Sequence, residues 1–208
     1  MVALEAVQGV TALIFFTFGV THMINHSMAY WGPEEYNSFQ KAAREIYLQP
    51  VVNGVILSAM CLHIGAGPSS WWGRRQAAKA AAEGKKDEDK KPEPEQRAGL
   101  VQSLHHLTGG ILAAVIFMHI RACKFATVPM TFESISFLIK DSKVTADFMG
   151  MYFAFFSFCG VIHMSLGLPR ALQLIGLDAL AHQIKYLALL MLVAGIIGTQ
   201  VGVRSMWG

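Results

Sequence analysis

Charged side chains are scarce in this sequence. They make up 15% of the 208 residues, whereas 53% are hydrophobic and the mean hydropathy is +0.41. Ordinary soluble domains carry about 25% charged residues, so this composition argues against that class and indicates a membrane protein.

Sequence motifs for several kinds of chemistry are also missing. The three cysteines, Cys61, Cys123 and Cys159, are isolated and form no Cys-x-x-Cys pair. This argues against an iron–sulfur cluster, a zinc site or a c-type haem within the chain. No nucleotide-binding loop, nucleophile-and-base pattern or zinc motif is present. We therefore expect no catalytic residue and no nucleic-acid partner, which leaves electron transfer and proton transfer.

Five apolar stretches are long enough to cross a membrane, since about 20 helical residues span a hydrocarbon core of about 30 Å. We predict an all-α fold in which residues 1–208 form one membrane domain, an integral bundle of five transmembrane helices. The predicted helices cover about 6–28, 48–67, 98–120, 148–168 and 184–203. The first stretch lacks the basic segment of a signal peptide, so we expect it to be retained.

A charged segment over 73–97 separates the second and third stretches. Eight of the 17 Lys and Arg residues lie between Arg74 and Arg97. Positive loops stay on the cytoplasmic or matrix side, so we expect this segment and the N-terminus there. Because it mixes both signs of charge, it is predicted to be a solvated, partly flexible inner loop; a docking strip for a soluble partner is the alternative.

Histidines recur at matching positions in the two halves of the chain. Thr11 stands eleven residues before His22, as Thr108 stands eleven before His119. Gly67 and Gly167 stand four residues after His63 and His163, respectively. The four histidines, one on each of four predicted helices, are His22, His63, His119 and His163.

Depth in the membrane decides which of these histidines can meet. His22 lies fifteen residues beyond Val7, about 22 Å along a helix that begins at the inner side. His119 is similarly far along its helix, whereas His63 and His163 lie on descending helices and approach the inner face. The sequence therefore predicts two haem b groups, one bound by His22 with His119 and one by His63 with His163. Plain hydrogen bonding between helices is the alternative role for these imidazoles.

Other polar residues near these helices have candidate roles. His26 lies one turn beyond His22 and could replace it as an iron ligand. Near the inner boundary of the third helix, a protonatable group could contact a quinone or a haem propionate; facing lipid headgroups is the alternative. The candidates there are Gln102, Ser103, His105 and His106.

Several motifs resemble the single-chain, five-helix, two-haem cytochrome b membrane anchor of succinate dehydrogenase and fumarate reductase (complex II). GVTHMINH followed by GPEEYNSF is similar to the end of that family's first helix and the loop after it. LHIGAG, IFMHIRA and VIHMSLGL are similar to its other three ligand regions, in the same order. SLHHLTGG is similar to a short motif of His or Gln, then Arg, then Ser/Thr-Gly, with His106 in the arginine position.

The resemblance implies partners and an electron path. An iron–sulfur subunit would dock on the inner face, and a flavoprotein subunit would carry the dicarboxylate chemistry. Electrons would pass between the iron–sulfur subunit and membrane quinone through the two haems, in the bacterial cytoplasmic membrane or the mitochondrial inner membrane. Two other functions stay open: a free-standing transmembrane cytochrome b, and a haem-free membrane interaction subunit.

Overall fold

The computed structural model describes residues 2–84, 95–124, 130–140 and 146–207. Within these ranges the regular elements are all helices, which confirms the predicted all-α fold. In chain order they are α1 (Val2–Met28), α2 (Pro33–Tyr47), α3 (Pro50–Gly84), α4 (Glu95–Lys124), α5 (Phe132–Lys140), α6 (Ala146–Leu174) and α7 (Asp178–Trp207).

Five of these helices are long and apolar enough to cross a membrane, as the sequence predicts. Most residues in each span are not buried inside the protein, because lipid tails can cover apolar side chains as well as protein can. The spans are Ala3–Met28, Pro50–Gly73, Gly99–Cys123, Gly150–Leu174 and Asp178–Met206. The chain thus has the character of a multi-pass membrane protein in contact with lipid.

Helix α6 is the central element of the bundle. It packs against α1, α4 and α7, and its span has the largest buried share of the five. Small buried residues on α6, among them Ser157, Gly160 and Ser165, let its neighbours approach closely. Helix α1 packs on α3 in the first half of the chain, as α4 packs on α6 in the second. Since α6 contacts both halves, it fixes how they sit together.

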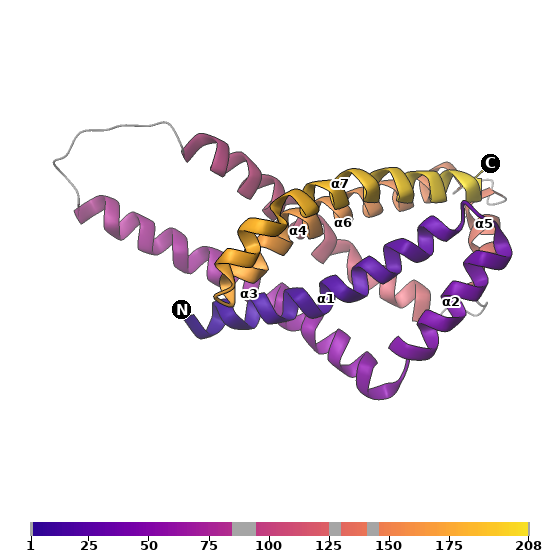
Figure 1. The fold of residues 1–208 in the computed structure, drawn as a ribbon, viewed down its shortest axis with the longest axis horizontal. Coiled ribbons are helices and arrows are strands. Elements are labelled where there is room, and N and C mark those ends of the chain that lie inside the picture. The colour runs from indigo at the N-terminus through magenta and orange to yellow at the C-terminus, as the bar shows by residue number, and fades with distance from the viewer. Residues whose placement is uncertain (1, 85–94, 125–129, 141–145, 208) are drawn as a thin grey trace.

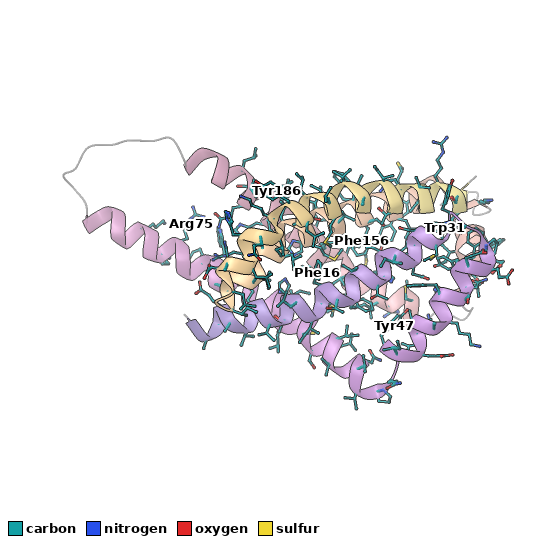
Figure 2. The ribbon with its side chains drawn as sticks, viewed as in Figure 1. Phe16, Trp31, Tyr47, Arg75, Phe156 and Tyr186 are labelled. Carbon is teal, nitrogen blue, oxygen red and sulfur yellow. The ribbon has the colours of Figure 1, made fainter. Side chains whose placement is uncertain are left out.

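The two termini lie at opposite ends of the bundle (Figure 1), as five crossings require. The N-terminus lies at the end from which α3 and α4 project, and the C-terminus lies beside α5. We call these the inner end and the outer end, following the predicted orientation. Arg75 and Trp31 lie toward the inner and outer ends, respectively, in Figure 2.

The prediction of a loop over the whole of 73–97 is wrong. Helix α3 continues through Gly84, and α4 already begins at Glu95; residues 85–94 lie outside the described ranges. The alanine-rich sequence at 77–82 accounts for the extension of α3, because alanine is the strongest helix former. Lengthening a helix that already exists also avoids the unfavourable nucleation step.

Two membrane helices continue past prolines at which the sequence predicts their ends. Pro68 lies inside α3 and Pro169 inside α6. Proline lacks the N–H for the helical ladder, but a membrane helix tolerates it where the freed carbonyl finds another partner. The predicted ends of these two helices, at 67 and 168, are therefore too early.

The shorter helices α2 and α5 form the outer end and are absent from the sequence prediction. Asn37 of α2 joins them: its Oδ1 accepts the N–H of Phe132 at 2.8 Å, and its Nδ2 donates to Glu133 at 3.2 Å. The N–H of Glu133 itself, Thr131 and Asn37 lower the pKa of the Glu133 carboxyl by hydrogen bonding. Tyr36 of α2 and Ile135 of α5 also share an apolar cluster with Ala29 and Met206.

Candidate functional site

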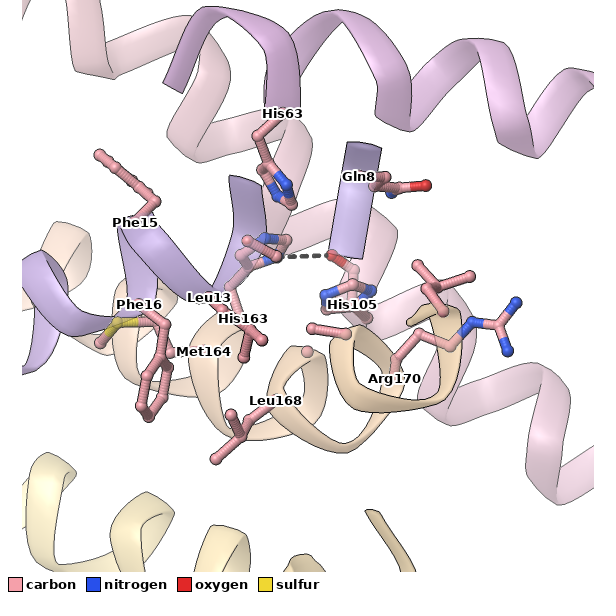
Figure 3. A pocket seen from close by; sticks show the side chains of 14 residues that line it. Gln8, Leu13, Phe15, Phe16, His63, His105, His163, Met164, Leu168 and Arg170 are labelled. Carbon is pink, nitrogen blue, oxygen red and sulfur yellow. Dashed lines mark hydrogen bonds between the residues drawn. The ribbon is translucent and has the colours of Figure 1, made fainter. Parts of the chain in front are cut away.

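The side chains of His63 in α3 and His163 in α6 meet toward the inner end of the bundle. The centres of their rings are 6.1 Å apart, and the ring planes cross at 76°. Both residues line one cavity, which Figure 3 shows together with His105 of α4. We call His63 and His163 the inner pair.

A second pair, which we call the outer pair, consists of His22 in α1 and His119 in α4. Their ring centres are 5.9 Å apart, and the planes cross at 75°. His22 stacks on Phe18 with the ring centres 5.6 Å apart, and His119 packs on Phe156 at 5.2 Å. The structure thus brings together the two pairs that helix depth selects. That these imidazoles bind haem iron stays a prediction.

The spacing within both pairs suits a metal held between two imidazoles. Metal–imidazole bonds of about 2.0 Å, as in zinc sites, place the centres of two rings on opposite sides of one ion about 6 Å apart. Among the described residues, no group of three or more His, Cys, Asp or Glu side chains could hold a bare metal ion. A haem iron needs only two axial protein ligands, because the macrocycle supplies the others.

The backbone holds the second ring nitrogen of His163. Its Nδ1 donates to the carbonyl oxygen of His105 at 3.1 Å, which leaves Nε2 for a metal. Metal-binding histidines almost always donate their other N–H to a carbonyl, a carboxylate or water. The Nδ1 of His63 is buried near the backbone of Gln8, without a hydrogen bond of good geometry. The hydrogen bond of His163 is therefore compatible with a metal at its other ring nitrogen.

In the outer pair, His26 remains an alternative to His22. The Nε2 atoms of the two residues lie 3.3 Å apart on neighbouring turns of α1. Because both side chains come from one helix, only one of them can face His119 across a macrocycle. His119 Nδ1 lies 3.5 Å from the Tyr152 hydroxyl, and its Nε2 lies 3.8 Å from Cys123 Sγ. Tyr152 is thus a candidate partner for His119 that sequence reasoning missed.

A cavity of about 50 Å³ adjoins the inner pair, and most of its lining is apolar. Sequence reasoning missed two of its polar groups, Gln8 of α1 and Arg170 of α6. The internal repeat could have indicated Gln8, which stands three residues before the threonine of its half, as His105 does in the other half. The polar lining residues are Gln8, His63, His105, His163 and Arg170.

The four polar residues predicted near the inner boundary of α4 face different surroundings. His105 stacks on His163, with ring centres 4.3 Å apart and planes within 8° of parallel. His106 meets the edge of Trp71 in α3, with ring centres 6.2 Å apart. Only His105 belongs to the surroundings of the inner pair. The exposed residues are Gln102, Ser103 and His106.

Glycines bring the backbone close to these rings. A Cβ added at Gly109 would lie 2.7 Å from Cε1 of His163, and one at Gly167 would lie 2.9 Å from Nε2 of His105. At Gly110, an added Cβ would meet nothing within 4 Å. The position of the His163 ring on α4 therefore requires a residue without a side chain at 109 but not at 110.

No family model, curated protein or solved structure matches this chain. Two facing imidazoles can bind one metal centre axially. A pair at each of two depths can therefore place two such centres across the membrane, where buried polar side chains are costly and usually functional.

Replacing Gly109 with Ala should destabilise the fold. The new methyl group would press on the His163 ring, and overpacking of this kind costs about 1–3 kcal/mol. The measurement is thermal unfolding of the purified protein in detergent, followed by circular dichroism. Gly110→Ala is the matched control and should unfold at the wild-type temperature or above, because alanine is the better helix former. Equal losses in the two variants would contradict the requirement at 109.

Proposed function

We propose that this protein binds two haem b groups, one at the inner pair and one at the outer pair. We further propose that it is the membrane anchor of a succinate:quinone oxidoreductase, complex II. It passes electrons between an iron–sulfur subunit and membrane quinone. The observation that carries the proposal is the meeting of four repeat-related histidines as two pairs, with ring centres 6.1 and 5.9 Å apart.

The residues around the inner pair fit a haem. His63 and His163 would hold the iron, and the mainly apolar side chains around them would suit the macrocycle. Arg170 and Gln8 line the same cavity and offer polar partners for the two carboxylates of the haem. When bound, the haem supplies a one-electron carrier whose potential depends on its ligands, burial and hydrogen bonds.

The two sites lie at different depths of one bundle. Gln8 lines the inner cavity and His22 belongs to the outer pair, fourteen residues further along α1. At 1.5 Å per residue, this separation is about 21 Å. Two haems held at these depths make a path for electrons from one side of the membrane toward the other.

The assignment to complex II is supported by the order of the histidine motifs and by the shape of the inner end. Helices α3 and α4 extend beyond their membrane spans there (Figure 1). Exposed Arg75 and Lys79 lie on the extension of α3. This end is the docking surface for the iron–sulfur subunit, and the flavoprotein subunit carries the dicarboxylate chemistry. The membrane is an energy-transducing one, bacterial cytoplasmic or mitochondrial inner.

The proposed quinone site lies on the exposed face of α4 near its inner end. Gln102 and Ser103 are exposed there, and His106 is exposed beside Trp71. The two polar side chains can hold one quinone carbonyl while the imidazole donates to the other. An imidazole also suits the uptake of protons that accompanies quinone reduction.

Ligand removal should empty the two sites separately. His63→Leu and His163→Leu should each remove the same haem, so that the haem content falls from about two to about one per chain. His22→Leu should remove the other haem, whereas His26→Leu should keep both. Haem content and low-temperature optical spectra of the purified variants measure this. Wild-type protein without a Soret band would contradict haem binding, and loss of the outer haem in His26→Leu alone would make His26 the ligand.

Purification from the native membrane in mild detergent should yield a complex with two further subunits, one containing flavin and one containing iron–sulfur clusters. Reversing the charge of Arg75 and Lys79 to Glu should weaken retention of the iron–sulfur subunit, because rim charges steer association. Arg204→Glu is the matched control, since Arg204 is exposed on the last turn of α7 at the outer end. A haem-containing chain that purifies alone would indicate a free-standing cytochrome b.

His106→Leu should slow succinate:quinone turnover by about 10²-fold, the usual contribution of a general acid, while leaving haem content unchanged. His182→Leu is the matched control, because His182 is also exposed near the inner end but lies on α7. The measurements are steady-state activity with a soluble quinone and the haem spectrum. Full activity of His106→Leu would place the quinone elsewhere.

A further inference from the structure

Thr108 bonds to the same carbonyl as His163. Its Oγ1 lies 2.9 Å from Leu104 O and 3.1 Å from His105 O, and only 4% of the residue is exposed. His163 Nδ1 donates to that same His105 O at 3.1 Å. One backbone carbonyl thus meets a hydroxyl of its own helix and an imidazole of α6.

The first half of the chain repeats the threonine part of this arrangement. Thr11 Oγ1 lies 2.7 Å from Val7 O and 3.2 Å from Gln8 O, and 5% of the residue is exposed. The buried Nδ1 of His63 lies near the backbone of Gln8. The residue three before each repeated threonine therefore lies near one member of the inner pair, and in the second half its carbonyl accepts the ring N–H.

The glycines that stand four residues after the inner-pair histidines also occupy corresponding places in the two halves. A Cβ added at Gly67, four residues after His63, would lie 3.8 Å from the side-chain nitrogen of Gln8. A Cβ added at Gly167, four residues after His163, would lie 2.9 Å from Nε2 of His105. The two halves therefore share contacts as well as sequence spacing.

A threonine hydroxyl that bonds back to a carbonyl one turn earlier tends to bend the helix at that point. The shorter contact of the Thr108 hydroxyl is to Leu104 O, so that His105 O, which accepts one helical N–H, keeps its second lone pair for the ring N–H of α6. A ring N–H placed there is fixed in orientation and tautomer, and its other nitrogen is left for a metal.

We infer that Thr108 is a positioning residue for the inner pair, acting on His163 through the carbonyl of His105. Thr11 is its counterpart in the repeat and lies near His63. The inference rests on the proposed function, because the imidazoles are oriented as iron ligands. It also accounts for the repeated spacing: eleven residues are about three helical turns, so one face of α1 or α4 carries both a positioning threonine for the inner haem and a ligand for the outer one.

Thr199 of α7 supplies the structural comparison. It is fully buried, and its Oγ1 lies 2.7 Å from Gly195 O and 3.3 Å from Ile196 O. A buried hydroxyl in a membrane helix needs such a bond in any case. Helix α7 carries none of the four paired histidines, so Thr199→Val measures the cost of losing the hydroxyl bond alone.

The experiment compares Thr108→Val, which keeps the shape and removes the hydroxyl, with Thr108→Ser, which keeps the hydroxyl, in the intact complex. In Thr108→Val the inner haem should dissociate about tenfold faster, the usual size of an effect beyond the direct ligands, and its midpoint potential should shift. The outer haem should not change, and Thr108→Ser should restore the wild-type values. Thr11→Val should affect the same haem.

Thr199→Val should leave both haems as in the wild type. The inference is overturned if Thr199→Val has the same effect as Thr108→Val, or if Thr108→Val leaves the inner haem unchanged. A second measurement needs no haem: ¹⁵N NMR of labelled histidine in the haem-free chain, with the His163 signal assigned from His163→Leu. Its Nδ1–H resonance should shift in Thr108→Val and return in Thr108→Ser; an unshifted signal also overturns the inference. A wild-type chain that binds no haem would instead overturn the proposed function.

Discussion

The hydrogen bond from His163 Nδ1 to the carbonyl of His105 is the interaction on which the centre of the bundle depends. A neutral imidazole has two polar nitrogens, and inside a membrane there is no water to satisfy them. The neighbouring helices have already used their N–H groups in their own ladders, so a carbonyl lone pair is the partner that the backbone can offer. To reach it, the ring must lie almost on the surface of α4.

That close approach sets the packing of α4 on α6. Gly109 gives the ring its place, and Gly167 gives the His105 side chain room to stack beside it. The surroundings of the outer pair are different, because the nearest polar partners of His119 are side chains, the Tyr152 hydroxyl and the Cys123 thiol. His163 is therefore held by the backbone, whereas His119 has side-chain partners.

The sequence predicts the five spans and the meeting of the histidines because both depend only on distances along a helix. Twenty apolar residues cross a bilayer, and the rise per residue gives the depth of each ring. It does not predict α2 and α5, since these helices are short and mix polar with apolar residues. Nor does it predict that α3 continues to Gly84. The charge of this segment indicates a loop, but its alanine-rich sequence favours a helix.

Finer features of the site depend on which way a side chain turns. Adjacent histidines at 105 and 106 look equivalent in sequence, but they point a third of a turn apart on a helix. One lies against the inner pair and the other against Trp71. The choice between His22 and His26 is harder still, because both lie on nearly the same face, one turn apart.

The internal repeat has a geometric consequence for the two histidine pairs. His22 occupies the same place in the first half as His119 in the second, and His63 the same place as His163, so each pair joins a residue to its own counterpart. Contacts between identical positions are the mark of an interface with two-fold symmetry. The symmetry does not extend to the helices, because α1 packs on α6 whereas the described parts of α4 and α3 make no comparable contact. The two sites therefore follow the internal repeat, although the packing of the helices around them does not.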